Sequence, residues 1–173
     1  MMTYQYIYSL GAPFALISEL RCKNWFGATE NEGVQYDKLL NILNSEIDDD
    51  AKYNIINCQI DDVELLVFDK TTSVYKVNEN IFLQFESISE NYKIDINNIL
   101  MVLNSNNKVV KNCIQVNLDQ GKYFLFDSAF DFFEVLDDKN YLEFDFDVGV
   151  TNILIDYHET ENFNCWLIKF CHA

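Results

Sequence analysis

Residues 113–127 of the chain read CIQVNLDQGKYFLFD, and this stretch contains the pattern that decides the fold. Two runs rich in β-branched and aromatic residues, Cys113 to Leu118 and Lys122 to Asp127, flank the polar stretch Asp119-Gln120-Gly121. Such runs favour β-strands, and a three-residue connection with glycine in the left-handed position is typical of a hairpin. A parallel crossover needs a dozen or more residues, so strands joined this closely are predicted to pair antiparallel.

The same pattern recurs on both sides of this stretch. Short runs of apolar and aromatic residues are bounded by Asn, Asp or Gly, which favour turns. The further predicted strands are Thr3 to Ser9, Phe14 to Glu19, Tyr53 to Ile60, Val63 to Phe68, Ile81 to Ile88, Tyr141 to Val148, Thr151 to Tyr157 and Asn164 to Phe170. Short connections are expected at Gly11-Ala12-Pro13, at Asp61-Asp62 and around Gly149.

Two segments change to the helical period of about 3.6 residues. Val34 to Ile47 is predicted to be a helix whose apolar face consists of Tyr36, Leu39, Leu40, Leu43 and Ile47. The run Asp48-Asp49-Asp50 should end it, because the helix dipole disfavours carboxylates at the C-terminus. Ile94 to Leu103 fits a second, short helix with Asp95 as its N-cap.

The predicted fold class is α+β, mostly antiparallel β-sheet with one or two helices. One proline and five glycines among 173 residues leave no Pro-rich or Gly/Ser-rich linker. Residues 1–173 are therefore expected to form a single domain.

Composition narrows the class of partner. The chain has 28 Asp and Glu against 12 Lys and Arg, a formal net charge of −16. Nucleic acid and anionic membranes are disfavoured as partners, because both are bound through clustered basic residues. The N-terminus lacks the pattern of a signal peptide, and no apolar run approaches the roughly 18 residues of a membrane span, so a cytoplasmic location is expected.

Residue types that carry common enzyme chemistry are sparse. His158 and His172 are the only histidines, and neither has a Cys or another His at ligand spacing, so no metal site is predicted. Five cysteines occur without a Cys-x-x-Cys pair and are expected to be reduced thiols. An Asx-type turn is a simpler interpretation of Asp127-Ser128 than a reactive serine. No catalytic residue and no cofactor is predicted.

The most distinctive polar feature is the strand LEFDFDV at residues 142–148. Its strict alternation predicts that Leu142, Phe144, Phe146 and Val148 point inward and that the three carboxylates point outward, about 7 Å apart. These carboxylates, Glu143, Asp145 and Asp147, are the first candidate site residues. Further acidic residues could extend the same surface, namely Asp61, Asp62, Glu64, Asp137 and Asp138.

Several interpretations of this acidic surface stay open. Antiparallel sheets commonly face water on one side, so it could be an ordinary solvated face. It could instead be complementary to a basic protein, which would raise the rate and specificity of association. Paired carboxylates also perform acid–base catalysis in glycoside hydrolases. Large side chains such as Trp25, Tyr75 or Tyr92 would contribute more binding energy if they were exposed.

Segments spread over most of the chain carry a family resemblance. They are the strand–turn–strand run Tyr6 to Ile17, Trp25-Phe26-Gly27, Tyr36-Asp37, Glu64-Leu65-Leu66-Val67-Phe68 followed by Ile81 to Phe85, and Tyr123-Phe124-Leu125-Phe126-Asp127-Ser128-Ala129. In this order they resemble the Immunity protein 21 family of bacterial polymorphic-toxin systems. The chain departs from that pattern at Leu40, where a Cys is expected, and around Asp131 to Phe133, where a Gly is expected.

The resemblance implies a cytoplasmic inhibitor that protects its producer by binding a cognate toxin, and it implies no catalytic residue. A nuclease toxin with a basic substrate groove would match the acidic surface, whose carboxylates would then occupy the place of phosphates. The alternatives from different classes are a carboxylate-using hydrolase and an adaptor or chaperone for a secreted effector.

Overall fold

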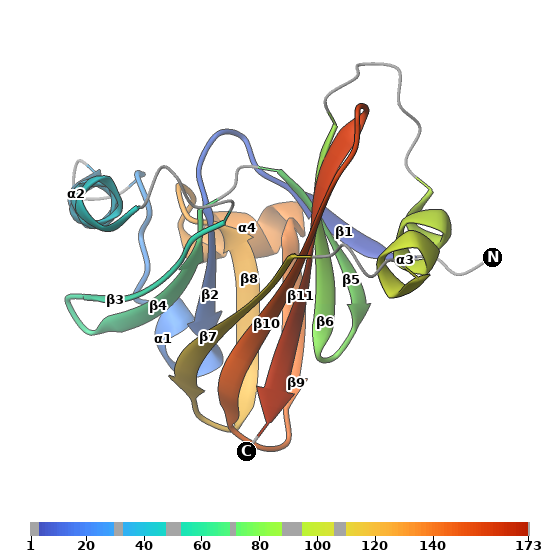
Figure 1. Ribbon diagram of the computed structural model, residues 1–173. Helices are drawn as coiled ribbons and strands as arrows, with labels where there is room; N and C mark the ends of the chain where they lie inside the picture. Colours follow the sequence, from blue (N-terminus) through green and yellow to red (C-terminus); the bar gives the residue numbers. More distant parts are fainter. Residues whose placement is uncertain are drawn as a thin grey trace.

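Two antiparallel β-sheets pack face to face, with four helices around them (Figure 1). The computed structural model describes residues 4–29, 33–47, 53–69, 72–87, 95–105 and 110–172. The six-stranded sheet has the order β1 (Gln5–Tyr8), β5 (Ser73–Asn78), β6 (Ile81–Ser87), β11 (Phe163–His172), β10 (Val150–Glu159) and β7 (Val110–Leu118). The five-stranded sheet has the order β3 (Ile55–Ile60), β4 (Val63–Phe68), β2 (Phe14–Ser18), β8 (Gly121–Asp127) and β9 (Tyr141–Phe146). The predicted α+β class is confirmed.

The helices are α1 (Glu19–Cys22), α2 (Val34–Glu46), α3 (Ile96–Ser105) and α4 (Phe132–Asp138). Both predicted helices are present, and the Asp95 carboxylate accepts a hydrogen bond from the Asn98 amide at 3.2 Å, as an N-cap should. Leu40 is 36% exposed, so its predicted place on the buried face of α2 is wrong. The run Asp48-Asp49-Asp50 lies outside the described residues.

Every predicted strand is present, with ends shifted by a few residues, whereas β5, α1 and α4 were not predicted. The signal for α4 was available, because Asp131 is followed three residues later by Glu134, a common helix start. The Asp131 carboxylate accepts hydrogen bonds from the amides of Phe133 at 2.8 Å and Glu134 at 2.9 Å.

The hairpin predicted at residues 113–127 is wrong in its pairing. β7 pairs with β10 in one sheet, and β8 pairs with β2 and β9 in the other. The connections β1–β2 and β9–β10 likewise cross between the sheets. Leu118 of β7 and Tyr123 of β8 both belong to the core cluster between the sheets, so each strand buries its apolar face from a different sheet. True hairpins are β3–β4 through Asp61-Asp62, β5–β6 and β10–β11.

Aromatic side chains fill the space between the sheets. Phe82 and Phe170 from the six-stranded sheet meet Phe144 and Phe146 from β9, with ring centroids 5.0–5.9 Å apart in tilted or edge-on arrangements. All four side chains are at most 3% exposed. Burial of a ring of this size stabilises the fold by roughly 2–3 kcal/mol, so this layer holds the two sheets together.

Helices cover the outer face of each sheet in part. Leu39 and Leu43 of α2 belong to a cluster on the five-stranded sheet that includes Ile17 and Val67. Ile99 and Leu103 of α3 belong to a cluster on the six-stranded sheet, and their spacing of four residues places them on one face of the helix.

The Asp127 junction ties three distant segments together, and we define it as Ser9, Leu10, Trp25, Asp127 and Ser128. The buried Asp127 carboxylate accepts hydrogen bonds from the Leu10 amide at 2.8 Å and the Ser9 hydroxyl at 3.0 Å. It also accepts one from the Ala129 amide at 2.9 Å, which is the predicted Asx-type turn. The indole of Trp25 donates to the Ser128 carbonyl at 3.1 Å.

Gly27 lets two segments of the chain approach closely at this junction. Its φ is +56°, and a Cβ there would lie 2.4 Å from the carbonyl oxygen of Ala129. Tyr36 lies nearby, since burial and the Asp127 carboxylate both raise its pKa. Most of the segments that carry the family resemblance therefore meet at one buried point and serve the fold.

Replacing Asp127 with Asn should destabilise the protein by about 2 kcal/mol, because one amide oxygen cannot serve all three donors that now face the carboxylate. Urea unfolding followed by tryptophan fluorescence measures the change. Asp137→Asn on the exposed end of α4 is the matched control and should stay within about 0.5 kcal/mol of wild type. Equal effects of the two substitutions would contradict the role assigned to Asp127.

Candidate functional site

The acidic strand β9 has the predicted alternation along most of its length. Leu142, Phe144 and Phe146 are at most 1% exposed, while the side chains of Glu143, Asp145 and Asp147 lie on the outer side. Val148 is 50% exposed, so its predicted inward position is wrong. The strand ends at Phe146, and Val148 belongs to the connection that carries the chain to the other sheet.

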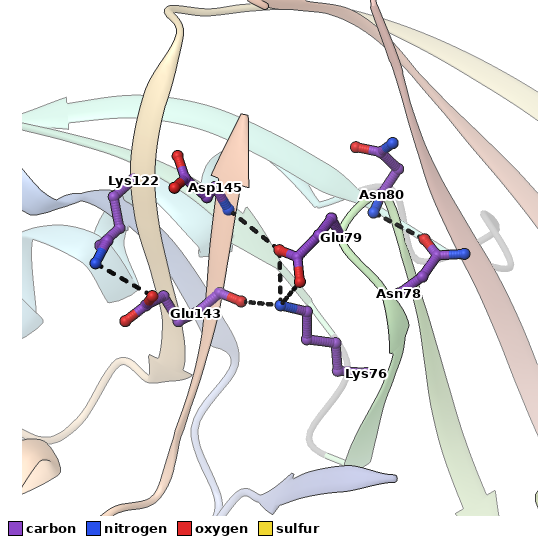
Figure 2. A network of polar contacts seen from close by, with 7 residues as sticks. All are labelled: Lys76, Asn78, Glu79, Asn80, Lys122, Glu143 and Asp145. Carbon is purple, nitrogen blue, oxygen red and sulfur yellow. Dashed lines mark hydrogen bonds and ion pairs between the residues drawn. The ribbon is translucent and has the colours of Figure 1, made fainter. Parts of the chain in front are cut away.

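Polar contacts join β9 to the β5–β6 turn (Figure 2). Lys76 donates to the Glu143 carbonyl and pairs with Glu79 at 2.8 Å. The Asp145 amide donates to the Glu79 carboxylate at 3.4 Å. Because β9 belongs to one sheet and the β5–β6 turn to the other, these contacts close this side of the sandwich.

The carboxylate of Glu143 also has a partner. It pairs with Lys122 of β8 at 3.2 Å, as Figure 2 shows. This hydrogen bond raises the pKa of Lys122 above its ordinary value, and Glu19 and Asp145 add to the shift. Part of the acidic strand is therefore neutralised within the protein by Lys122.

The turn residues Asp61 and Asp62 bind neighbouring segments. Lys38 of α2 pairs with Asp61 and holds the pKa of that carboxyl below its ordinary value. The Asp62 carboxylate accepts from Asn24 at 2.7 Å and from Arg21 at 3.2 Å. Exposed pairs of this kind contribute about 0–1 kcal/mol each, so they orient the β3–β4 hairpin more than they stabilise the fold.

A groove of about 550 Å³ opens at the end of the sandwich where β7 turns into β8. Apolar side chains from both sheets line it, namely Leu16, Leu66, Leu118 and Tyr123. Four carboxylates lie along it, from Glu19, Asp62, Glu64 and Asp119, against the two cations of Arg21 and Lys122. The sequence pointed to Asp62 and Glu64 but missed Glu19 and Asp119, because nothing in their spacing shows that the chain brings them together.

The predicted acidic residues do not all share one surface. Asp62 and Glu64 lie in the groove, and Glu143 and Asp145 lie beside it through Lys122. Asp137 and Asp138 lie on α4, at the opposite end of β8 (Figure 1). Asp138 lines a separate pocket of about 450 Å³ together with the exposed side chains of Tyr6, Tyr8 and Leu10.

Two of the three large side chains considered as anchors have structural roles, and the third, Tyr92, lies outside the described residues. Trp25 is fully buried in the Asp127 junction. Tyr75 is half-buried and stacks on Tyr6 with a centroid distance of 5.6 Å.

The described residues give little support to nucleophilic or metal chemistry. Ser128 is fully buried and its hydroxyl has no hydrogen-bond partner in the described part of the chain. Burial raises the pKa of Cys22 and Cys58 to about 11 and that of Cys165 to about 12, so these thiols are protonated at neutral pH. Within the described ranges, no three His, Cys, Asp or Glu side chains gather as a metal site would require.

None of the helices in the described part of the chain has the length and apolar character that crossing a membrane requires. The chain matches no protein-family model, no curated protein and no solved structure. The resemblance to the Immunity protein 21 family therefore rests on the quoted motifs and their order.

Thiol labelling checks the burial of the cysteines. Iodoacetamide at pH 8 should modify the exposed Cys113 at least about ten times faster than Cys22 or Cys165, because a buried, protonated thiol reacts slowly. Peptide mass mapping over time measures the rates, and labelling in urea should make the three thiols equivalent. Comparable native rates at Cys113 and Cys165 would contradict the described packing.

Proposed function

We propose that this protein neutralises a cognate bacterial toxin by direct, stoichiometric binding through its acidic surface. The observation that carries the proposal is the groove at the β7–β8 end, which four carboxylates line together with apolar side chains and the two cations of Arg21 and Lys122. An apolar centre with a charged rim is the usual composition of a protein-binding surface. The resemblance to the Immunity protein 21 family supports the same function.

The charge of the protein supports a basic partner. The net charge is −16, and the field around Lys122 is negative enough to raise its pKa. Complementary charge speeds the encounter of two proteins and suppresses wrong partners. A nuclease toxin fits this requirement, since its substrate groove must attract phosphates, and carboxylates of the inhibitor would take their place.

A carboxylate-using hydrolase is the second candidate function, because Glu64 and Asp119 line one groove. Paired carboxylates across a cleft are the machinery of glycoside hydrolysis. Hydrolysis of chromogenic glycosides by the wild type, lost in Glu64→Gln, would favour this candidate over the inhibitor.

Purified protein should form a 1:1 complex at micromolar concentration with the toxin encoded by the neighbouring gene, and it should suppress the activity of that toxin in equal molar amount. Size-exclusion chromatography and a toxin activity assay measure the two effects. The absence of a complex at micromolar concentration would overturn the proposed function.

Charge reversal at Asp145 and Asp147 tests the acidic strand. The double substitution to Lys should slow association with the toxin by about ten-fold at low salt and should weaken the salt dependence of the rate. Asp137→Lys with Asp138→Lys makes the same change in net charge at the opposite end and should slow association by less than about three-fold. Stopped-flow kinetics at two salt concentrations separate the cases, and unchanged kinetics of the first variant would remove β9 from the interface.

A further inference from the structure

The two sides of the sandwich differ in whether polar contacts join the sheets. On one side, Lys76, Glu79 and Glu143 join the sheets, and the side-chain amide of Asn140 bonds the backbone of Tyr8 at 3.0 and 3.3 Å. On the other side lie the edge strands β7 and β3, each paired on only one flank within the described residues. Figure 1 shows the β3–β4 hairpin reaching out beyond β7 on this open side.

The edge strand β7 carries only part of the usual protection against pairing. Lys111 lies near its start, and its pairing with β10 shifts register between Gln115 and Leu118. Residues 112–118, NCIQVNL, carry no charge, proline or glycine in a chain of net charge −16. Natural edges are commonly blunted by charges, prolines or bulges, because a bare edge recruits another strand. A partner strand that adds here would satisfy the free backbone groups of β7.

The hydrophobic core between the two sheets is also incompletely covered on the open side. Ile55 of β3 and Ile114 and Val116 of β7 pack against the core between the sheets while remaining partly exposed. A strand added to β7 would lie about 4.8 Å away in the same sheet and about 10 Å from the opposite sheet. Its inward side chains would cover these aliphatic residues and face the groove at the Leu118 end of β7.

Charge decides between the possible occupants. Glu19, Asp62, Glu64 and Asp119 line the groove into which β7 leads. A second copy of this chain would bring the same carboxylates and a second charge of −16 to the contact, which like-charge repulsion opposes. A strand with basic side chains would instead gain from those carboxylates.

We propose that the open side binds an extended segment of a basic protein, which adds to β7 as a seventh strand. Its inward side chains are aliphatic beside Ile114 and Val116 and are Lys or Arg where they reach Glu64 and Asp119. That the segment belongs to the toxin rests on the proposed function, whereas the strand site itself does not.

Two labelled peptides test the site without the toxin. Their sequences are TVTVTKTKT and the reverse, TKTKTVTVT, which place Lys at the groove in a parallel and an antiparallel strand, respectively. One of them should bind the protein at least about ten-fold tighter than its counterpart with Glu in place of Lys. Fluorescence anisotropy measures the affinities, and the tighter peptide reports the strand direction.

Backbone methylation separates strand pairing from simple charge attraction. Two methylated versions of the peptide are made, one with N-methyl groups on the odd-numbered amides and one with them on the even-numbered amides. Each version keeps the charge of the parent but cannot pair through one of its two edges. One methylated peptide should bind at least about ten-fold more weakly than the parent peptide, and the other should bind as tightly as the parent. Equal binding of both methylated peptides and the parent would overturn the proposal.

The protein side is tested in parallel. Glu64→Lys with Asp119→Lys should weaken peptide binding by about ten-fold, and Asp137→Lys with Asp138→Lys, which equals it in net charge, by less than about three-fold. Amide hydrogen exchange at residues 112–118 should slow in the complex. Equal losses in the two variants, or unchanged exchange, would overturn the strand site.

The same exchange measurement on the toxin complex distinguishes the two proposals. A complex that forms without slowing exchange at residues 112–118 would overturn the strand site as the toxin contact and leave the inhibitor function intact. Peptide binding at β7 without any toxin complex would overturn the inhibitor function and leave the strand site intact.

Discussion

The aromatic layer between the two sheets is the contact on which the rest of the structure depends. Phe82, Phe144, Phe146 and Phe170 pack edge to face and tilted across the interface, and the chain crosses that interface at β1–β2, β4–β5, β7–β8 and β9–β10. Because each crossing is short, the residues before and after it must both point into the core. Gly149 shows how tight this is, since a Cβ there would lie 2.9 Å from the Leu118 carbonyl oxygen.

Closing a sandwich on one side and leaving it open on the other has consequences for function. The closed side uses carboxylates of the acidic strand in contacts within the protein, such as the Glu143–Lys122 pair. The open side keeps the groove carboxylates beside an edge strand and partly covered aliphatic residues. The same excess of acidic residues therefore has a structural role on one side, and on the other it lines the groove that we propose as a binding site, where Asp62 already pairs with Arg21.

The motifs that carry the family resemblance lie mainly at the Asp127 junction. Trp25, Gly27 and Asp127 act through buried hydrogen bonds and close backbone contact, so they specify how segments far apart in sequence join. A fold does not by itself fix function, which depends on the sites that the fold carries. The groove and the edge of β7 are the proposed sites, and they share no residue with the junction.

Local pattern was sufficient to predict every described strand except β5, the helices α2 and α3, the Asx turn at Asp127 and the alternation of β9 up to Phe146, because each depends on neighbours within a few residues. The sequence could not predict that β7 and β8 lie in different sheets, because a short connection suits a hairpin and a crossing equally well. It could not show that Glu19, Asp62, Glu64 and Asp119 meet in one groove while Asp137 and Asp138 lie at the other end. The sequence by itself determined most of the inward-pointing residues, with Leu40 and Val148 as exceptions, and how much negative charge the protein carries. The tertiary structure decided where that charge gathers. The two sheets gain free energy by burying their apolar faces against each other, and this packing determines which distant segments become neighbours.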